Sequence, residues 1–557
     1  MSFRTEPAHS RNLWSLTIKD VSAPLDMTSN LLEDQRTVWL VAAVSFLLFL
    51  IGNLPWQLDD YDQAKQAYTS LGMIKEGRWF YQQTPHERVA TKPPLVGWVS
   101  AGLFAITRSW EVSWRLPSLL AAIALAVLLF RTGSSAYGSI AGLVALSAFG
   151  LNLLSPRLAT LVRTDMPLAL VTFLIGLLIW QKIERQEEWK PRDRVYLFAL
   201  LTIAMLIKGP IVYAFLLPGI GVFEWWRRRH ACRYSGVMAE VGNPGQDTPC
   251  QTSASAWSGW WPWIASLAVF LLWVTGGILS QPGFFDEVVM REFLGRFGET
   301  IHRPQPLYFY LPHLVHKFAP WSILLIAIAI FDLALRRWRI GTAFREISPD
   351  TFWLLCWSLG GFIVMSLIPS KRVDRIFPVI PPLCLLLATQ IAKHNSFSHG
   401  SMSRHLTSVD SDLPGPRPVA TENGRLRIYR WTMLALIFSL LFAGGYTTWK
   451  VVSGYRDHRD ALAIFGRDVR RKAEERHWRY EAVSAKDEGL LLYLRKTHYI
   501  EPDRAVAEWN VGNLDALVAS TEKAPGLMPQ LRGATVSQLK SSDRTKEKGT
   551  GYILITP

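Results

Sequence analysis

The stretch VWLVAAVSFLLFLIGNLPW, residues 38–56, contains no charged residue and is long enough to cross a bilayer as one helix. Similar apolar blocks recur along the 557 residues, for example within 260–279 and 433–446. The length alone would suggest about three or four soluble domains. However, apolar residues make up 49% of the chain and charged residues only 19%, which argues against a soluble protein. The sequence therefore predicts a polytopic α-helical membrane protein.

Hydropathy predicts about twelve to thirteen transmembrane helices. The apolar segments are 37–56, 93–108, 115–131, 138–155, 166–183, 195–207, 210–226, 259–280, 313–335, 351–369, 375–392 and 429–448. Counting crossings from the two ends of the chain gives results that differ by one between residues 57 and 165. Either a span is missing from this count or one segment there is re-entrant, and Pro93, Pro94 and Pro156 are candidate breaks.

Basic clusters set the expected orientation. The net charge is +15, and the clusters 227–229, 336–339 and 425–430 each adjoin an apolar segment. This is the positive-inside pattern, and it explains the charge better than nucleic-acid binding does. We expect a cytoplasmic tail over 1–36 and a membrane domain over 37–448.

The polar parts of the chain complete the expected domain organisation. Within the membrane domain, 57–92 is the first periplasmic loop, with interfacial helices, and 394–424 is a flexible cytoplasmic loop. Residues 449–557 are long enough for a small α/β domain, expected on the periplasmic side. The four cysteines lack metal-ligand spacing, which predicts free thiols.

An acidic, aromatic loop, LDDYDQ at 58–63, follows the first apolar segment and ends at TKPPL, residues 91–95. Charges beside hydrocarbon are costly, so this loop is a candidate functional site. A carboxylate such as Asp62 can take a proton from a hydroxyl, and a lysine such as Lys92 can hold a phosphate. The structural alternatives are an N-cap for Asp62 and a snorkelling side chain for Lys92.

Three further segments place charges at the same membrane face. Arg163 and Asp165 begin one apolar segment, as a helix cap or as groups that orient a sugar or catalytic acid. Lys208 interrupts another, where it needs a partner or a cavity. The sequence SKRVDR at 370–375 is either a solvated turn or an anion-binding loop.

These segments, in this order, resemble the GT-C type of membrane glycosyltransferase, which includes protein O-mannosyltransferases and the aminoarabinose transferase of lipid A. The resemblance runs from about Asp59 to Pro382, roughly 60% of the chain. It rests on Asp62, Gly77-Arg78-Trp79, Lys92-Pro93-Pro94-Leu95, Arg163 to Leu168, Lys208 to Pro210, Arg296-Phe297, His302-Arg303, Tyr310, Pro320-Trp321, Ser370-Lys371, Pro378 and Pro381-Pro382.

The chain departs from the family pattern at three positions. The second residue of the family's acidic motif is Gln63 here, with Asp59 or Asp60 as a substitute acid. Thr91 stands where many relatives have an acid, and Arg375 where the aminoarabinose transferase has a tyrosine. The sugar pocket is therefore expected to differ.

The resemblance implies an inverting transferase that takes a sugar from a polyprenyl-phosphate donor to a hydroxyl or phosphate of a lipid, glycan or protein. It implies Asp62 as general base and Asp165 as a second catalytic carboxylate. The substrate-binding set is Asp59, Asp60, Lys92, Arg163, Lys208, Arg296, His302, Lys371, Arg372 and Arg375. No obligatory metal or cofactor is expected, although some GT-C enzymes use a divalent cation. A bacterial inner membrane, with the site at the periplasmic face, follows from the same resemblance.

Three other classes stay open at this point. A transporter or lipid flippase would show inverted repeats and helices broken at mid-membrane, and no clear repeat is evident. A lipid-binding scaffold would tolerate Asp62→Asn. A polymerase or ligase that takes an oligosaccharide from a lipid pyrophosphate would differ in its donor.

Overall fold

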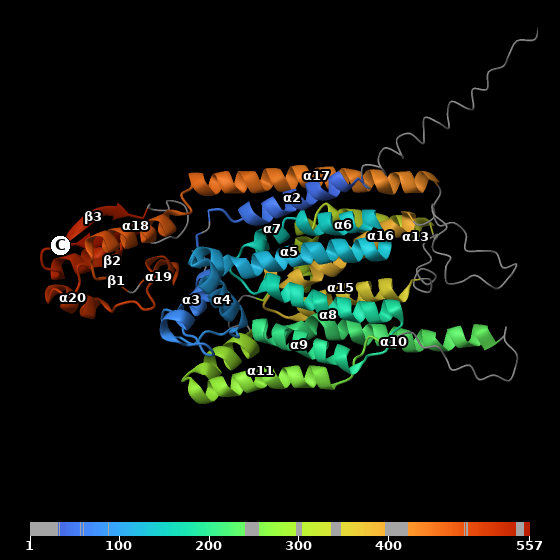
Figure 1. Ribbon diagram of the computed structural model, residues 1–557, viewed down its shortest axis with the longest axis horizontal. Helices are drawn as coiled ribbons and strands as arrows, with labels where there is room; N and C mark the ends of the chain where they lie inside the picture. Colours follow the sequence, from blue (N-terminus) through green and yellow to red (C-terminus); the bar gives the residue numbers. More distant parts are fainter. Residues whose placement is uncertain are drawn as a thin grey trace, which may run out of the picture.

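Long apolar helices run side by side along one axis, and a small α/β unit lies at one end of them (Figure 1). The computed structural model describes residues 32, 34–55, 57–58, 61–86, 88–239, 255–296, 304–335, 347–395, 422–483, 485, 488–541 and 551–557. The end of α10 and the start of α17 lie at the opposite end from the α/β unit (Figure 1). The basic clusters 227–229 and 425–430 belong to these two helices, so they mark the end of the bundle away from the α/β unit.

The bundle is formed by apolar helices from most of the chain. They are α2 (Gln35–Ile51), α5 (Trp110–Tyr137), α6 (Ser139–Gly150), α8 (Asp165–Arg185), α9 (Pro191–Lys208), α10 (Ile211–Ala239), α11 (Trp261–Ser280), α13 (Trp321–Leu335), α15 (Pro349–Leu367), α16 (Ile380–Asn395) and α17 (Glu422–Arg456). Shorter elements connect them. These are α3 (Tyr61–Glu76), α4 (Leu95–Thr107), α7 (Ser155–Ala159), the π-helix η1 (Phe285–Phe293), the 3₁₀ helices η2 (Leu294–Arg296), η3 (Leu307–Phe309) and η4 (Val373–Val379), and α12 (Tyr310–Lys317).

Length and composition identify this chain as a polytopic helical membrane protein. Among the described residues, six helices are long and apolar enough to cross a bilayer, or seven if the bent pair 307–317 and 321–335 is one span. That pair is bent by 102°. Three further apolar helices, α2, α4 and α6, are shorter. The total of about twelve to thirteen spans stays a prediction, because length alone does not decide which short helices cross.

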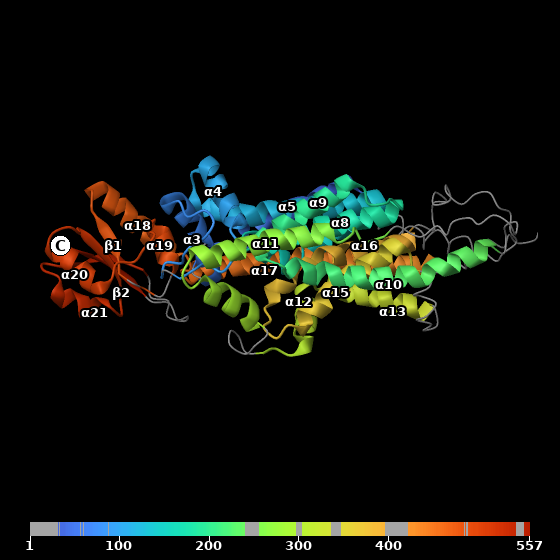
Figure 2. The same cartoon turned by 90° about the horizontal axis from the view of Figure 1, so that it is seen from below.

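Helix α4 is a candidate for the segment on which the two crossing counts disagree. It covers most of the predicted span 93–108 but has only 13 residues, a rise of about 20 Å against a hydrocarbon core of about 30 Å. It lies next to α3 at the end of the bundle near the α/β unit, not along the bundle axis (Figures 1 and 2). With α4 on one side of the membrane, the counts from the two ends of the chain agree.

Close helix packing at the centre of the bundle depends on a glycine. Gly176 of α8 faces Trp357 of α15, and a Cβ at this position would lie 2.1 Å from the indole ring. The ring of Trp357 stacks on Phe173 at 5.6 Å and on Trp353 at 6.1 Å, and both tryptophans are fully buried. Small residues let helix backbones approach closely in membrane proteins, and α8 and α15 use this device.

We expect Gly176→Ala to destabilise the bundle, because the added methyl group overlaps a buried ring that has no room to move. Overpacking of this kind costs about 1–3 kcal/mol, so the thermal unfolding temperature of the protein in detergent should fall by several degrees. Gly221→Ala on α10 is the matched control, since nothing lies within 4 Å of its Cβ position. Equal unfolding temperatures for the two variants would show that the contact with Trp357 does not limit packing.

The α/β unit begins directly after α17. Its elements are α18 (Ala461–Arg476), β1 (Tyr480–Ala482), α19 (Glu488–Leu494), α20 (Pro502–Asn510), β2 (Ala516–Ser520), α21 (Ala524–Leu527), the 3₁₀ helix η6 (Met528–Gln530), β3 (Thr535–Lys540) and β4 (Tyr552–Thr556). The four strands have the order β1-β2-β4-β3. β1 is parallel to β2, with Tyr480 opposite Ala516, and the other two pairs are antiparallel.

This unit shares a hydrophobic core with the end of the bundle that adjoins it. The shared cluster joins Leu58, Tyr68 and Trp114 to Leu490, Tyr493 and other buried residues of the α/β unit. The backbone N–H of Leu58 donates to the Tyr493 hydroxyl at 2.6 Å, and Leu462 N–H donates to Gln57 Oε1 at 3.1 Å. Two hydrogen bonds to the α/β unit therefore fix the segment that leads into α3.

Candidate active site

Five segments that are far apart in the sequence bring charged side chains to the bundle end nearest the α/β unit. Asp62 lies in the first turn of α3, Lys92 precedes α4, and Asp165 begins α8. Lys208 is the last residue of α9, which ends at Gly209 with a φ of 74° before Pro210. The SKRVDR segment, 370–375, leads into η4. An aspartate at the start of a helix and a lysine at its end both interact favourably with the helix dipole.

An alternating network of charges connects three of these segments. The Arg372 guanidinium donates to the Asp62 carboxylate, and Arg163 Nη2 lies 3.8 Å from the same Asp62 oxygen. Arg163 Nη1 donates to Asp374 Oδ2 at 2.6 Å. Arg163 and Asp374 are buried, whereas the Asp62 side chain is 25% exposed. The carboxylate of Asp62 is thus held in place but open to a ligand.

The surroundings of Asp62 keep it ionised. Burial raises its pKa, but the ammonium of Lys92 and the guanidinium groups of Arg372 and Arg163 outweigh burial and bring the pKa from 3.8 to about 2. Lys92 therefore lies close enough to Asp62 to influence its pKa. At neutral pH the carboxylate is a proton acceptor with low basicity.

A cavity of about 330 Å³ opens beside this network. Three cations, Lys92, Lys208 and Arg375, line it together with Thr91, Pro93, Pro210, Ile211, Ala214, Glu292, Phe293, Val364, Met365 and Ile368. The Lys208 ammonium donates to the Asp165 carboxylate, which is itself buried. Cations next to an apolar wall suit an amphiphile with an anionic head, so we call this the donor cavity.

The structure brings some of the predicted site residues together and separates others. Asp62, Lys92, Arg163, Asp165, Lys208, Arg372 and Arg375 meet at one end of the bundle. Lys371 is buried, and its ammonium donates to the carbonyl of Gln305 at 2.9 Å. It does not line the donor cavity, where Arg375 lies instead. Asp59, Asp60, His302 and the side chain of Arg296 lie outside the described residues.

Two residues of the site were not predicted as site residues. Asp374 anchors Arg163, and the only available signal was its place within the charged SKRVDR segment. Gln63 stands where the family has its second acid, and its amide oxygen accepts the N–H of Val162 at 3.2 Å. This bond fixes the backbone next to Arg163 and needs an acceptor oxygen but no negative charge.

The chain is similar to known glycosyltransferases. A family model described as dolichyl-phosphate-mannose-protein mannosyltransferase matches residues 91–237. An undecaprenyl phosphate-alpha-4-amino-4-deoxy-L-arabinose arabinosyl transferase from Pseudomonas savastanoi pv. phaseolicola is 24% identical over 413 residues, 71% of this chain and 69% of that protein. A similar transferase from Sodalis glossinidius is 24% identical over 62% of this chain and 56% of its own length.

The fold is shared with a solved transferase. ArnT from Cupriavidus metallidurans, in a crystal structure with bound undecaprenyl phosphate, superposes with a TM-score of 0.61 at 16% identity. The match covers 93% of this chain and 97% of that one. Fold, site and relatives together define a membrane glycosyltransferase. The family model, the relatives and the shared fold support a GT-C type glycosyltransferase that uses a polyprenyl-phosphate sugar.

We expect Arg372→Gln to raise the pKa of Asp62, because it removes one of the cations that hold the carboxylate ionised. The stability linked to this lowered pKa is present above pH 3.8 and is lost as the pH falls toward 2. Infrared difference spectra against Asp62→Asn would follow protonation of the carboxyl group. Arg471→Gln on α18, with its side chain 72% exposed, is the control. An unchanged titration in Arg372→Gln would contradict the assigned network.

Proposed function

We propose that this enzyme transfers a sugar from undecaprenyl phosphate, or a related polyprenyl phosphate, to an acceptor hydroxyl or phosphate at the periplasmic face of a bacterial inner membrane. The observation that carries the proposal is the donor cavity, with its three cations next to an apolar wall and within electrostatic reach of Asp62. The cations suit the lipid phosphate and the wall suits the first isoprene units. Arginine and lysine are the usual partners of phosphate.

The residues of the site can perform the transfer in one displacement. Asp62 takes the proton of an acceptor hydroxyl as that oxygen forms a bond to the anomeric carbon. The bond between this carbon and the phosphate oxygen breaks, and its electron pair stays on the phosphate. Lys92, Lys208 and Arg375 stabilise the charge that develops there. Attack from the face opposite the phosphate inverts the anomeric configuration. Asp165 holds Lys208 and has a positioning role in this scheme.

Binding of the donor would also change the basicity of Asp62. Among the charges that lower its pKa, Lys92 has the largest influence, and Lys92 also lines the donor cavity. A phosphate bound to Lys92 would offset that cation, so the pKa of Asp62 would rise when the donor is present. The base would then come closer to the pH range in which proton transfer is efficient.

A density map of the full chain in lipid nanodiscs with added undecaprenyl phosphate tests the donor assignment. We expect phosphate density between Lys92, Lys208 and Arg375, with the lipid chain along Val364 and Ile368. An empty cavity together with a continuous water path across the membrane would favour a transporter instead.

Asp62→Asn should remove the base while keeping nearly the same shape. We expect turnover of the polyprenyl-phosphate sugar to fall by about 10²- to 10⁴-fold, with undecaprenyl phosphate still bound. Single-turnover transfer and lipid binding in nanodiscs would measure the two effects. A variant that keeps wild-type turnover would favour the scaffold interpretation.

Lys92→Gln and Lys371→Gln are a matched pair of variants. They test whether the lysine in the donor cavity or the lysine in the SKRVDR loop binds the lipid phosphate. Loss of a charged hydrogen bond costs about 1.5–3 kcal/mol, so Lys92→Gln should weaken undecaprenyl phosphate binding by about 10- to 100-fold. Lys371→Gln should have a much smaller effect, because its ammonium is bonded to a backbone carbonyl outside the cavity. Equal losses would place Lys371 in the phosphate site after all.

A further inference from the structure

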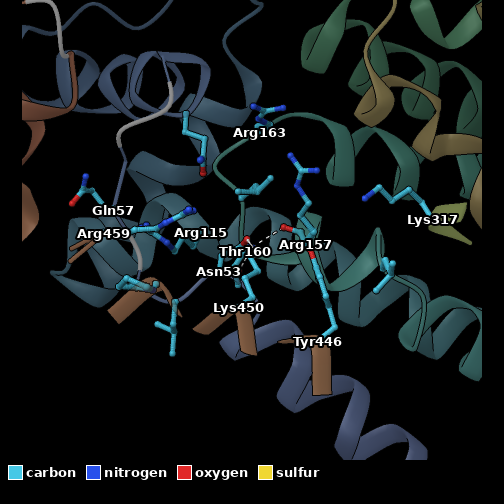
Figure 3. A pocket seen from close by; sticks show the side chains of 16 residues that line it. Asn53, Gln57, Arg115, Arg157, Thr160, Arg163, Lys317, Tyr446, Lys450 and Arg459 are labelled. Atoms are coloured by element: carbon cyan, nitrogen blue, oxygen red, sulfur yellow. Dashed lines mark hydrogen bonds between the residues drawn. The ribbon is translucent and has the colours of Figure 1, made fainter. Parts of the chain in front are cut away.

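An apolar cavity lies far from the site, between α2, α5 and α6. It has a volume of about 450 Å³ and shares no described lining residue with the donor cavity. A different pocket adjoins Arg163 and contains Asn53, whose amide donates to the Arg157 carbonyl and to Thr160 Oγ1 (Figure 3). That pocket belongs to the bundle end that carries the site, whereas the apolar cavity does not. We call the apolar cavity the α2–α5 groove.

The groove opens on the outer surface of the bundle. α2 and α5 both pack along α6 and touch each other over a shorter stretch. The small side chains of Ala42 on α2 and Ala126 on α5 line the space left between them. Three larger apolar lining residues, Trp39, Phe46 and Val127, are 68%, 46% and 45% exposed. In a membrane bundle, exposed apolar side chains of long helices face the hydrocarbon, so a lipid can enter the groove from the side.

The groove has the length of a lipid chain. Along α2 its lining residues extend from Gln35 to Phe49, a rise of about 21 Å. The hydrocarbon core is about 30 Å thick, so this is more than the depth of one leaflet. Gln35 is the first residue of α2, and this end of the helix lies away from the α/β unit (Figure 1). The groove therefore begins near the headgroups at that end of the bundle and runs into the membrane.

The groove is too narrow for a helix. A volume of about 450 Å³ spread over about 21 Å gives a mean cross-section of about 20 Å². A helix with a diameter of about 10 Å would need about 80 Å². An extended hydrocarbon chain is one methylene group wide and fits this width. The shape of the groove thus favours an acyl chain over a transmembrane helix of a partner.

One end of the groove is positively charged. Of the described residues that line it, only Arg131 is ionised. It lies in the last two turns of α5, which ends at Tyr137, and it forms no ion pair within the part of the chain that the structure describes. Asp34 and Arg36, the neighbours of Gln35, have opposite charges, and Asp34 caps α2 by accepting the Arg36 N–H at 2.9 Å. An arginine at this depth is stable when its guanidinium reaches the headgroups.

The start of α6 adds to this charge. Ser139, the first residue of α6, lines the groove. The helix is capped by Gly138 with a φ of 94° and has no side chain that accepts its first N–H groups. The start of a helix carries a positive partial charge. Arg131 and the start of α6 therefore both favour an anion where the groove meets the headgroups.

We propose that the α2–α5 groove binds one anionic phospholipid of the leaflet away from the α/β unit. Its phosphate lies at Arg131 and the start of α6, and one acyl chain lies along Trp39, Phe46 and Val127. The bound chain fills the space between α2 and α5 and so stabilises the packing of α2. This site is separate from the donor cavity and does not rest on the proposed function.

Phosphatidylglycerol and phosphatidylcholine are suitable probes, because the first is anionic and the second is neutral overall. Each would be titrated into the full chain in detergent, and bound lipid would be counted by native mass spectrometry. We expect Arg131→Gln to weaken phosphatidylglycerol binding by about fivefold and to leave phosphatidylcholine binding unchanged. Arg185→Gln, which removes an exposed cation of α8 outside the groove, is the control. Equal phosphatidylglycerol affinities for both variants would overturn the headgroup assignment.

A pair of neighbouring alanines tests the acyl chain. Ala42→Phe places a ring in the groove, whereas Ala43→Phe places it on an exposed position of α2 outside the lining. We expect phosphatidylglycerol to raise the unfolding temperature of the wild type and of Ala43→Phe, and to have little effect on Ala42→Phe. Equal stabilisation of the two variants would overturn the groove as the lipid site. Should Ala42→Phe fail to fold, the Arg131→Gln titration decides.

A photo-crosslink identifies the occupant. The benzophenone amino acid p-benzoylphenylalanine, in place of Trp39, would be illuminated in membranes that contain phosphatidylglycerol, and the adducts would be identified by mass spectrometry. An adduct with phosphatidylglycerol that Ala42→Phe abolishes supports the proposal. Adducts with residues 1–31 or with a second copy of the chain, without lipid, would overturn it. Neither readout involves sugar transfer or undecaprenyl phosphate, so a failed donor assignment leaves this test intact.

Discussion

The pairing of Asp62 with Arg372 and Arg163 is the constraint on which the rest of the site depends. Charges next to hydrocarbon are stable only when they are paired or solvated. Asp62, Arg163 and Asp374 come from three distant parts of the chain, so the network forms only when α3, the start of α8 and η4 meet. Removal of one partner leaves a charge uncompensated in a poorly hydrated place, which costs more than the pair contributes. Assembly of the bundle end and assembly of the site are therefore one event.

The α/β unit belongs to the same assembly. It contributes the Tyr493 hydroxyl that receives the Leu58 N–H, and the N–H of Leu462 that binds Gln57. Both contacts lie within a few residues of Asp62, and the hydrophobic cluster beneath α3 is built from both parts of the protein. An α/β domain that was merely tethered to the membrane region would not share a hydrophobic core with α3, the helix that carries Asp62. The position of Asp62 is thus determined by the membrane bundle and the α/β unit together.

The sequence predicted the polytopic helical class correctly, because a fully apolar segment has few alternatives to a helix in a bilayer. It could not place α4, since a 13-residue apolar helix can lie at the interface or enter the membrane, and neighbours decide between them. The site was predicted as a set of segments, but not as a set of side chains. In the SKRVDR loop, Lys371 and Arg375 have similar local sequence signals, and only the backbone turn sends Arg375 to the cavity and Lys371 to a carbonyl.

The donor cavity lies close to the carboxylate of Asp62, and this has a chemical consequence. The cavity combines three cations with apolar residues. In the unliganded protein, Lys92 of this cavity, together with Arg372 and Arg163, brings the pKa of Asp62 to about 2, so the carboxylate is weakly basic. A phosphate at Lys92 would remove part of that influence. Under the proposed function, the basicity of Asp62 therefore rises when the donor is bound, so the base is strongest where the sugar to be transferred is present.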